Sequence, residues 1–243
     1  MAELYFVRHG QASFGAENYD ELSPSGRAQS RWLGEYFAQA GLRFDRVVTG
    51  TMQRHRQTAD EIVAAMGGPR VEAVRDAGLN EYDFSALFAA MGEAGLPASG
   101  VAAHGVASHG LSHDVASDVS SASAKKHFYR TLKRALQLWA DARLPGVVPE
   151  TWAEFQARVR RARMDLQRGG GRRVLVVSSG GPIAVAAQQV LQAPDATAIA
   201  LNMQIRNSSV CQYVFNDAAM SLVSFNAVPH LEHAQRREFV TYG

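Results

Sequence analysis

The chain has 243 residues, 47% of them hydrophobic, and its 25 lysines and arginines nearly balance 23 aspartates and glutamates. This length and apolar content suit one α/β domain with a single sizeable core, and the small charge excess gives no broad basic field for nucleic acid. The single cysteine, Cys211, excludes an intrachain disulfide and fits a reducing compartment. No run approaches the length of a membrane span and no leader precedes the first predicted strand, so we expect a soluble cytoplasmic protein.

An apolar run near the start of the chain, Tyr5–Val7, leads directly into Arg8, His9 and Gly10. Such a run predicts a strand buried on both faces, and open α/β sheets bind ligands beyond the carboxyl ends of their strands. Arginine matches phosphate oxygens, imidazole can act as a nucleophile, and glycine allows a sharp turn beside a ligand. The alternative is a strand that simply ends in polar residues at the surface.

A second apolar run, Arg46–Thr49, precedes a helical pattern over Met52–Met66 whose first turn contains Arg54. A cation at a helix start has the unfavourable sign, because the helix dipole favours anions there. We therefore expect the Arg54 guanidinium and the free amides of this helix to face a bound anion. The alternative is that Arg54 is solvated, or paired with Asp60 or Glu61 further along the helix.

The middle of the chain, Ala89–His127, contains no aromatic residue and is rich in small residues. We interpret it as part of an inserted cap over about residues 85–150, and a mobile active-site lid is one use for such a segment. The histidines His104, His109 and His113 fit no compact metal-ligand spacing, so we interpret them as solvated loop residues and predict no metal.

Two amphipathic helices are predicted after this insertion, over Phe128–Ala142 and Trp152–Leu166, from apolar residues at helical spacing. Their lysines and arginines invite comparison with a nucleic-acid surface. A solvated polar face is the stronger interpretation, because the charges of the whole chain nearly cancel.

A third apolar run, Val174–Val177, leads through the turn Ser178–Pro182 into a predicted helix over Ile183–Leu191. Pro182 suits the first helical position, and the two glycines of the turn allow an anion to approach its amides. Further on, the pattern of Ser209–Phe215 predicts a strand in which the cysteine packs rather than reacts.

Five short motifs occur along the chain in a fixed order. They are Arg8–Gly10, Leu22–Gln29, Met52–Ala59, Leu79–Phe84 and Val177–Pro182. Together they resemble the histidine phosphatase superfamily, the phosphoglycerate mutase-like fold, over about the first 84 residues and again from near residue 172. The resemblance implies an α/β three-layer sandwich with a mostly parallel central sheet, helices on both faces and an inserted cap, in a single domain over residues 1–243.

The resemblance also implies four catalytic residues. His9 is the nucleophile that forms a phosphohistidine, and Arg8 and Arg54 neutralise the phosphoryl oxygens. Glu81 matches the position that protonates the leaving oxygen and later deprotonates water, although by itself it reads as an ordinary surface carboxylate. Other implied phosphate- or substrate-binding positions are Gly10, Gln11, Ser13, Ser179 and Gly180. No cofactor is expected, and the expected partner is a small phosphorylated substrate or inorganic phosphate, without nucleic acid or membrane.

One position departs from the family pattern, because Ser179 stands where members with the full site have a second histidine. A serine hydroxyl offers a neutral hydrogen bond where a protonated histidine would add charge. We therefore expect a weaker, altered or absent phosphatase activity. His55 and His230 are candidates to fill the gap, although a structural role for each is the stronger interpretation.

Three functions remain open at this stage. A phosphomonoesterase is favoured, and a phosphate-binding or regulatory protein with impaired turnover follows from Ser179. A phosphoglycerate mutase comes third, because the stretches Gln11–Gly15 and Ser85–Leu87 lack polar contacts that mutases have at the corresponding places. The physiological substrate and the oligomeric state are not defined by the sequence.

Overall fold

The computed structural model describes residues 1–13, 20–68, 71–92 and 122–242. Residues 93–121, which make up most of the candidate lid and include the three histidines His104, His109 and His113, therefore lie outside the described residues. The chain divides into two compact units, of which the first comprises Met1–Glu81 with Gln156–Gly243 and the second Tyr82–Phe155.

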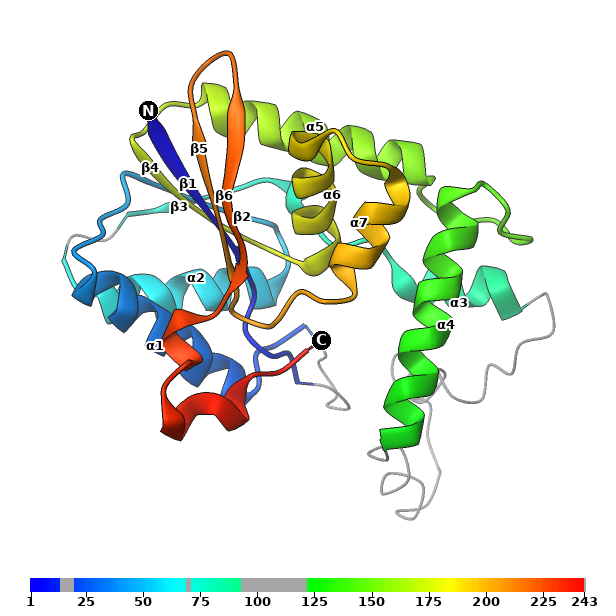
Figure 1. The fold of residues 1–243 in the computed structure, drawn as a ribbon, viewed down its shortest axis with the longest axis horizontal. Coiled ribbons are helices and arrows are strands. Elements are labelled where there is room, and N and C mark those ends of the chain that lie inside the picture. The colour runs from blue at the N-terminus through cyan, green and yellow to red at the C-terminus, as the bar shows by residue number, and fades with distance from the viewer. Residues whose placement is uncertain (14–19, 69–70, 93–121, 243) are drawn as a thin grey trace. The chain divides into compact units, whose positions relative to one another are not determined.

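The first unit is built on one sheet, which has six strands among the described residues (Figure 1). These are β1 Ala2–Arg8, β2 Arg46–Thr49, β3 Ala73–Arg75, β4 Arg173–Ser178, β5 Val210–Phe215 and β6 Met220–Ala227. Their order across the sheet is β3-β2-β4-β1-β5-β6. The first four strands in this order run parallel, and β5 and β6 are antiparallel additions. The prediction of an α/β fold with a mostly parallel sheet is confirmed.

Helices cover both faces of this sheet. They are α1 Pro24–Gln39, α2 Gln53–Met66, the part of α5 (Trp152–Arg168) that belongs to this unit, α6 Gly180–Leu191 and α7 Asp195–Asn202, with short 3-10 turns η1 Ala77–Leu79, η4 Pro229–Leu231 and η5 Ala234–Phe239. Helices α1 and α2 pack on one face, and α6 lies against the other (Figure 1). The Gln189 side-chain amide donates to the Gln156 carbonyl at 2.9 Å, which ties α6 to α5.

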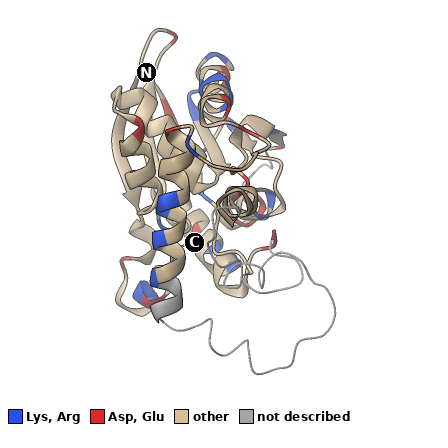
Figure 2. Ribbon diagram, turned by 90° about the vertical axis from the view of Figure 1, so that its right-hand side faces the viewer, with Lys and Arg blue, Asp and Glu red and all other residues tan. Residues whose placement is uncertain are grey.

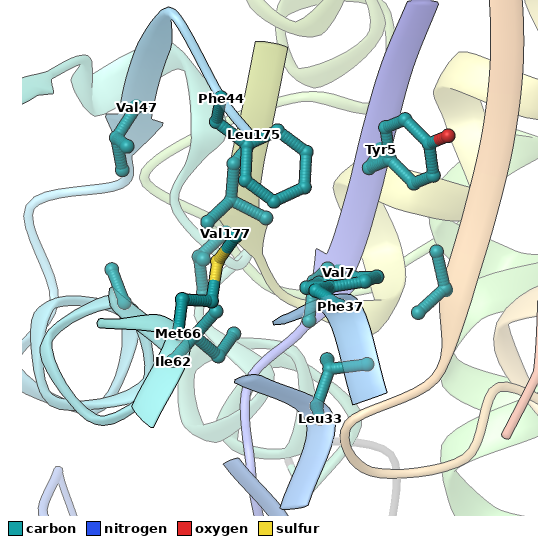
Figure 3. Packing of buried hydrophobic residues seen from close by; sticks show 12 residues of the cluster. Tyr5, Val7, Leu33, Phe37, Phe44, Val47, Ile62, Met66, Leu175 and Val177 are labelled. Carbon is teal, nitrogen blue, oxygen red and sulfur yellow. The ribbon is translucent and has the colours of Figure 1, made fainter. Parts of the chain in front are cut away.

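Alternate strand residues point into a core between the sheet and helices α1 and α2 (Figure 3). This core consists of Tyr5, Val7, Leu33, Phe37, Phe44, Val47, Ala59, Ile62, Met66, Leu175, Val177 and Val210. The remaining residues of β1 and β4, such as Phe6 and Val176, are buried on the opposite face. A strand covered on both sides requires a continuous apolar run, which is why the short runs in the sequence predict these strands correctly.

The register of the parallel strands places the start of three loops at one edge of the sheet. Arg8 at the end of β1 pairs with Ser178 at the end of β4, and Thr49 at the end of β2 pairs with Val177. The chain segments that follow these residues therefore leave the sheet side by side. This edge is where open α/β sheets bind ligands.

Helix α6 begins three residues earlier than the sequence predicts. It starts at Gly180 with Ser179 as its N-cap residue, so Pro182 occupies the third helical position rather than the first. The prediction of Pro182 at the first position is wrong, but proline is tolerated there because the first four amides of a helix have no partner within the helix. The consequence is that the glycines belong to the first turn of the helix.

The second unit contains α3 Phe84–Gly92, α4 Ala122–Ala140 and the first turn of α5. Its centre is aromatic: the Trp139 ring lies 5.1 Å from Trp152 and 5.4 Å from Phe155 between centroids. The Trp139 indole N–H donates to the Glu150 carbonyl at 2.9 Å. The lysines and arginines of α4, shown in blue in Figure 2, are solvent-exposed at positions such as Lys126.

Two further observations concern the possibility of a membrane-spanning helix and the surroundings of the single cysteine. In the part of the chain that the structure describes, no helix combines the length and the apolar character needed to cross a membrane. Cys211 is a free, fully buried thiol on β5, and burial raises its pKa to about 12. A buried thiol that does not ionise fits the packing role that the sequence predicts.

Gly34 marks a close approach of α1 to α2. A Cβ there would overlap the Ile62 carbonyl oxygen and lie 2.8 Å from the Ala65 Cβ. Overpacking costs about 1–3 kcal/mol, which exceeds the helix propensity gained from alanine, about 1 kcal/mol. We expect Gly34→Ala to lower the free energy of unfolding in urea by up to about 2 kcal/mol. The matched Gly92→Ala, whose methyl meets no described atom within 4 Å, should not lower it. Equal stability of Gly34→Ala and wild type would contradict this packing.

Candidate functional site

His9 follows β1 directly and is almost fully buried, with 4% of its surface exposed. Its backbone N–H donates to the Ser178 carbonyl at 2.9 Å, and its own carbonyl accepts from the Ser208 N–H at 3.2 Å. The ring is held at both nitrogens. Nδ1 lies 2.7 Å from the Gly10 carbonyl oxygen, and the Arg54 Nε–H donates to Nε2 at 3.2 Å.

These contacts define the protonation state of the His9 ring. A carbonyl oxygen can only accept, so Nδ1 carries the proton, and Nε2 presents its lone pair to Arg54. Burial, followed by the positive charges of Arg54 and Arg8, lowers the pKa of His9 well below its usual value. The ring is therefore a neutral imidazole whose Nε2 is available as a nucleophile.

Arg54 lies in the first turn of α2, is 5% exposed, and contacts a carboxylate as well as the His9 ring. Its Nη1 is 2.8 Å from Asp20 Oδ1, and the other Asp20 oxygen accepts from the Gln53 backbone N–H at 2.7 Å. The sequence predicts an anion at this helix start, and in the structure the Asp20 carboxylate occupies it. Glu61, one of the two alternative partners, is bonded to Arg27.

Arg8 reaches the same region from the end of β1. Its Nη1 donates to the Ile205 carbonyl, and a Cβ built on Gly180 would lie 3.9 Å from the Arg8 guanidinium carbon. Its charge acts on His9, because it is one of the causes of the lowered pKa of that ring. The predicted positions Arg8, His9, Arg54 and Gly180 are thus brought together.

Glu81 meets the start of α6. The Gly181 backbone N–H lies 3.1 Å and 3.2 Å from the two carboxylate oxygens of Glu81. The segment before it is fixed by Arg158, whose Nη1 donates to the Asn80 carbonyl at 2.7 Å, and by Ser178, whose hydroxyl donates to the Leu79 carbonyl at 2.6 Å. A carboxylate at a helix N-terminus has the favourable sign of interaction with the helix dipole. Glu81, an anionic side chain of the protein itself, thus accepts from one of the amides of this turn.

Ser179 is fully buried and does not cap its helix through its side chain. Its hydroxyl oxygen lies 2.7 Å from His55 Nε2, and the His55 ring centroid lies 5.6 Å from that of His9. Burial, and then the charge of Arg54, lowers the pKa of His55 well below its usual value. Of the two histidines that the sequence offers as candidates to fill the gap, His55 lies beside His9.

His230 forms a similar pair elsewhere. Its Nε2 is 2.8 Å from the Ser208 hydroxyl, and Ser208 in turn binds the His9 carbonyl through its backbone N–H. Burial and the charge of Arg236 lower the pKa of His230 to about 3. His230 thus binds Ser208, which in turn binds the His9 backbone. Its described hydrogen bonds do not involve the His9 ring nitrogens.

The other predicted binding positions differ in their surroundings. The Gly10 N–H donates to the Thr58 hydroxyl at 3.1 Å, and a Cβ on Gly10 would overlap the Gly26 carbonyl, so only glycine fits. The side-chain oxygen of Gln11 accepts from the Ser23 hydroxyl at 2.8 Å. For Ser13 the described contact is through its backbone, to the Glu21 carbonyl. None of the described hydrogen bonds joins Gln11 or Ser13 to His9.

Sequence reasoning missed Asp20 and Thr58. Asp20 is 34 residues from Arg54, and nothing in its local pattern indicates that it neutralises that arginine. Thr58 was part of the Met52–Ala59 motif, but a helical threonine gives no sign by itself that it binds the amide of Gly10. Among the described residues, no group of three or more histidines, cysteines or acidic residues could hold a metal ion.

The fold and the buried His9, which is hydrogen-bonded to Arg54, define a class of protein. The family model of the histidine phosphatase superfamily (branch 1) matches residues 4–90 and 112–228. The chain belongs to this superfamily.

Among its relatives, a 2,3-bisphosphoglycerate-dependent phosphoglycerate mutase from Bartonella bacilliformis is 32% identical over 90 residues, which cover 35% of this chain and 44% of that protein. The match to the first curated relatives thus spans less than half of their length. Solved structures with the same fold include a phosphoglycerate mutase from Bacillus anthracis, with a TM-score of 0.64, 17% identity and 94% of each chain covered. Another is a phosphoserine phosphatase from Entamoeba histolytica in complex with 3-phosphoglyceric acid, with a TM-score of 0.61, 18% identity, and 95% of this chain and 100% of that chain covered.

The lowered pKa of His230 predicts how stability depends on pH. Below about pH 6.5 the unfolded chain binds a proton at this residue, whereas the folded chain does so only near pH 3. Stability is therefore lost as pH falls through this window, by about 1.4 kcal/mol per pH unit for one histidine. His9 and His55 act in the same direction.

The test is urea unfolding of wild type and His230→Gln between pH 6 and pH 4.5. The variant should show a slope that is smaller by about 1.4 kcal/mol per pH unit, whatever its absolute stability. The matched control is His233→Gln, which replaces an exposed histidine in the same segment of the chain. An unchanged slope in His230→Gln would show that His230 is not neutral and buried in the folded protein.

Proposed function

We propose that the protein is a phosphomonoester hydrolase that acts through a phosphohistidine at His9. The observation that carries this proposal is the state of the His9 ring: Nδ1 is tied to the Gly10 carbonyl, and Nε2 faces Arg54 as an unprotonated acceptor. The superfamily membership, and relatives whose names include both phosphatases and phosphoglycerate mutases, support the same reaction class.

In the first step, the lone pair of His9 Nε2 forms a bond to phosphorus while the bond from phosphorus to the leaving oxygen breaks. Arg54 Nε, which faces Nε2 in the free protein, transfers its hydrogen bond to a phosphoryl oxygen, and Arg8 adds the second cation. Glu81, as a carboxylic acid, gives its proton to the leaving oxygen. The Nδ1–H···O=C bond to Gly10 stabilises the positive charge that develops on the ring.

In the second step, a water oxygen forms a bond to phosphorus while the N–P bond breaks. The Glu81 carboxylate takes the proton from this water, and His9 returns to its neutral state with Nε2 free. The protein contributes position and charge rather than further covalent chemistry, as is usual for phosphoryl transfer.

A phosphate-binding protein with little turnover is the second candidate, and the Asp20–Arg54 ion pair favours it. The carboxylate already neutralises the guanidinium on which a phosphoryl group would depend. A substrate must therefore either displace Asp20 or use the remaining donors of Arg54. A phosphoglycerate mutase is the third candidate and finds its support in the names of the curated relatives.

Hydrolysis of p-nitrophenyl phosphate tests the proposal. We expect wild type to release phosphate and His9→Ala to lose this activity, because alanine has no ring nitrogen with which to form the covalent intermediate. After incubation with a ³²P-labelled phosphomonoester, wild type should also carry an acid-labile label, and His9→Ala should not. Equal background rates for the two proteins would remove the enzyme hypothesis. Phosphate and vanadate titration by calorimetry would then test the binding protein, and interconversion of 2- and 3-phosphoglycerate tests the mutase.

Replacing Glu81 separates its role as an acid from a role in binding. We expect Glu81→Gln to slow hydrolysis of an alkyl phosphate by about a hundredfold or more, because an alkoxide leaving group needs a proton. For p-nitrophenyl phosphate, whose leaving group is stable as an anion, kcat/KM should fall much less. The comparison uses kcat/KM because it reports formation of the phosphohistidine and not its hydrolysis, in which Glu81 acts in the same way for both substrates. An exposed control, Glu72→Gln, should leave both rates unchanged. Equal losses with both substrates would contradict proton donation by Glu81.

A further inference from the structure

The pair His55–Ser179 is a buried polar contact that has no role in the two proposed reaction steps. Both residues have no exposed surface, and their side chains are 2.7 Å apart. His55 follows Arg54 directly in α2, and Ser179 precedes the glycines that meet Arg8 and Glu81. Ser179 is also the position at which the sequence resemblance predicts a second histidine.

The surroundings of His55 determine which ring nitrogen carries the proton. Within the described part of the chain, Nδ1 has no hydrogen-bond partner, and it faces Gly50, where an added Cβ would overlap it. A buried N–H without an acceptor is rarer and more costly than a buried lone pair without a donor. The lowered pKa means that only one nitrogen is protonated. The proton therefore lies on Nε2 and is donated to the Ser179 oxygen.

This assignment leaves the Ser179 hydroxyl proton free to point elsewhere. Because the serine oxygen accepts from His55, its own O–H has no acceptor among the described residues. The nearby His9 ring, 5.6 Å from His55 between centroids, is where a phosphoryl group would be attached. Since Ser179 is buried, its hydroxyl would meet an oxygen of a group bound to His9 rather than a ligand in open solvent.

We infer that His55 is a positioning residue that fixes the Ser179 hydroxyl as a hydrogen-bond donor to the phosphoryl group on His9. In this arrangement α2 supplies the imidazole and the β4–α6 turn supplies the contact with the substrate. The inference rests on the proposed phosphohistidine chemistry. It differs from that proposal in assigning a cooperating pair of neutral groups, in which neither His55 nor Ser179 changes its protonation state during the reaction.

A double-mutant cycle tests whether the two side chains act as a unit. Ser179→Ala and His55→Leu should each lower kcat for p-nitrophenyl phosphate by about a hundredfold, the usual cost of losing one donor to a developing charge, with KM little changed. The double variant should lose no more than either single variant. His55→Gln, whose amide can still donate to Ser179, should retain most of the activity and the wild-type pH profile. The matched variant Tyr213→Phe removes a buried hydroxyl from β5, opposite Leu4 and away from the His9 end of β1, and should leave kcat unchanged.

For variants with little activity or stability, binding measurements test the role of the His55–Ser179 pair. After thermal unfolding has shown which variants are folded, calorimetry compares vanadate, which resembles the transition state, with inorganic phosphate. Ser179→Ala and His55→Leu should weaken vanadate binding much more than phosphate binding. Ser179→His alone should lower kcat because His55 fills the space, and combination with His55→Ala should restore part of it.

The outcomes separate this inference from the proposed function. Wild-type activity no higher than that of His9→Ala removes the phosphatase, and the vanadate comparison then decides the role of the pair. An active wild type with unchanged kcat and vanadate affinity in a folded Ser179→Ala overturns the inference and leaves the phosphatase intact. Additive losses in the double variant, or a shifted pH profile in His55→Gln, would also overturn it.

Discussion

The contacts of the His9 ring are the constraint on which the site depends. One nitrogen must keep its proton and the other must lose it, and this is achieved by a backbone carbonyl on one side and the guanidinium of Arg54 on the other. The carbonyl belongs to Gly10, whose position requires the close approach of α1 at Gly26. The chemistry of the ring therefore depends on how β1, α1 and α2 pack together.

Around this ring the chain supplies its own anions to donors that a phosphate would use. Asp20 binds the start of α2 together with Arg54, and Glu81 binds the start of α6. These carboxylates accept from helix amides and pair with a buried cation, groups that would cost stability if they had no partner. In the proposed reaction they also set a condition on binding, because an incoming phosphoryl group would compete with Asp20 for Arg54.

Much of the architecture could be predicted because it rests on local patterns. The short apolar runs define the parallel strands, and the residues after them, such as Arg8 and His9, lie at the ligand-binding edge for that reason. The pairs Asp20–Arg54 and His55–Ser179 could not be predicted, because they join residues 34 and 124 positions apart. Their geometry depends on helix packing that no local pattern encodes. The same limit applies to the start of α6 at Gly180. Here Glu81, which is about 100 positions away in the sequence, accepts from the Gly181 amide.

The tautomer and charge of His9 can be observed directly by ¹⁵N NMR of the imidazole rings in the free wild-type protein. The account predicts a neutral ring with the proton on Nδ1 at pH 7, unchanged when the pH is lowered to about one unit below the ordinary histidine pKa of ~6.5. In the variant Arg54→Lys, the Nε2 chemical shift of His9 should change while the proton stays on Nδ1. A proton on Nε2, or an imidazolium ring at pH 7, would contradict the proposal, because neither form has a lone pair on Nε2, the nitrogen proposed to attack phosphorus.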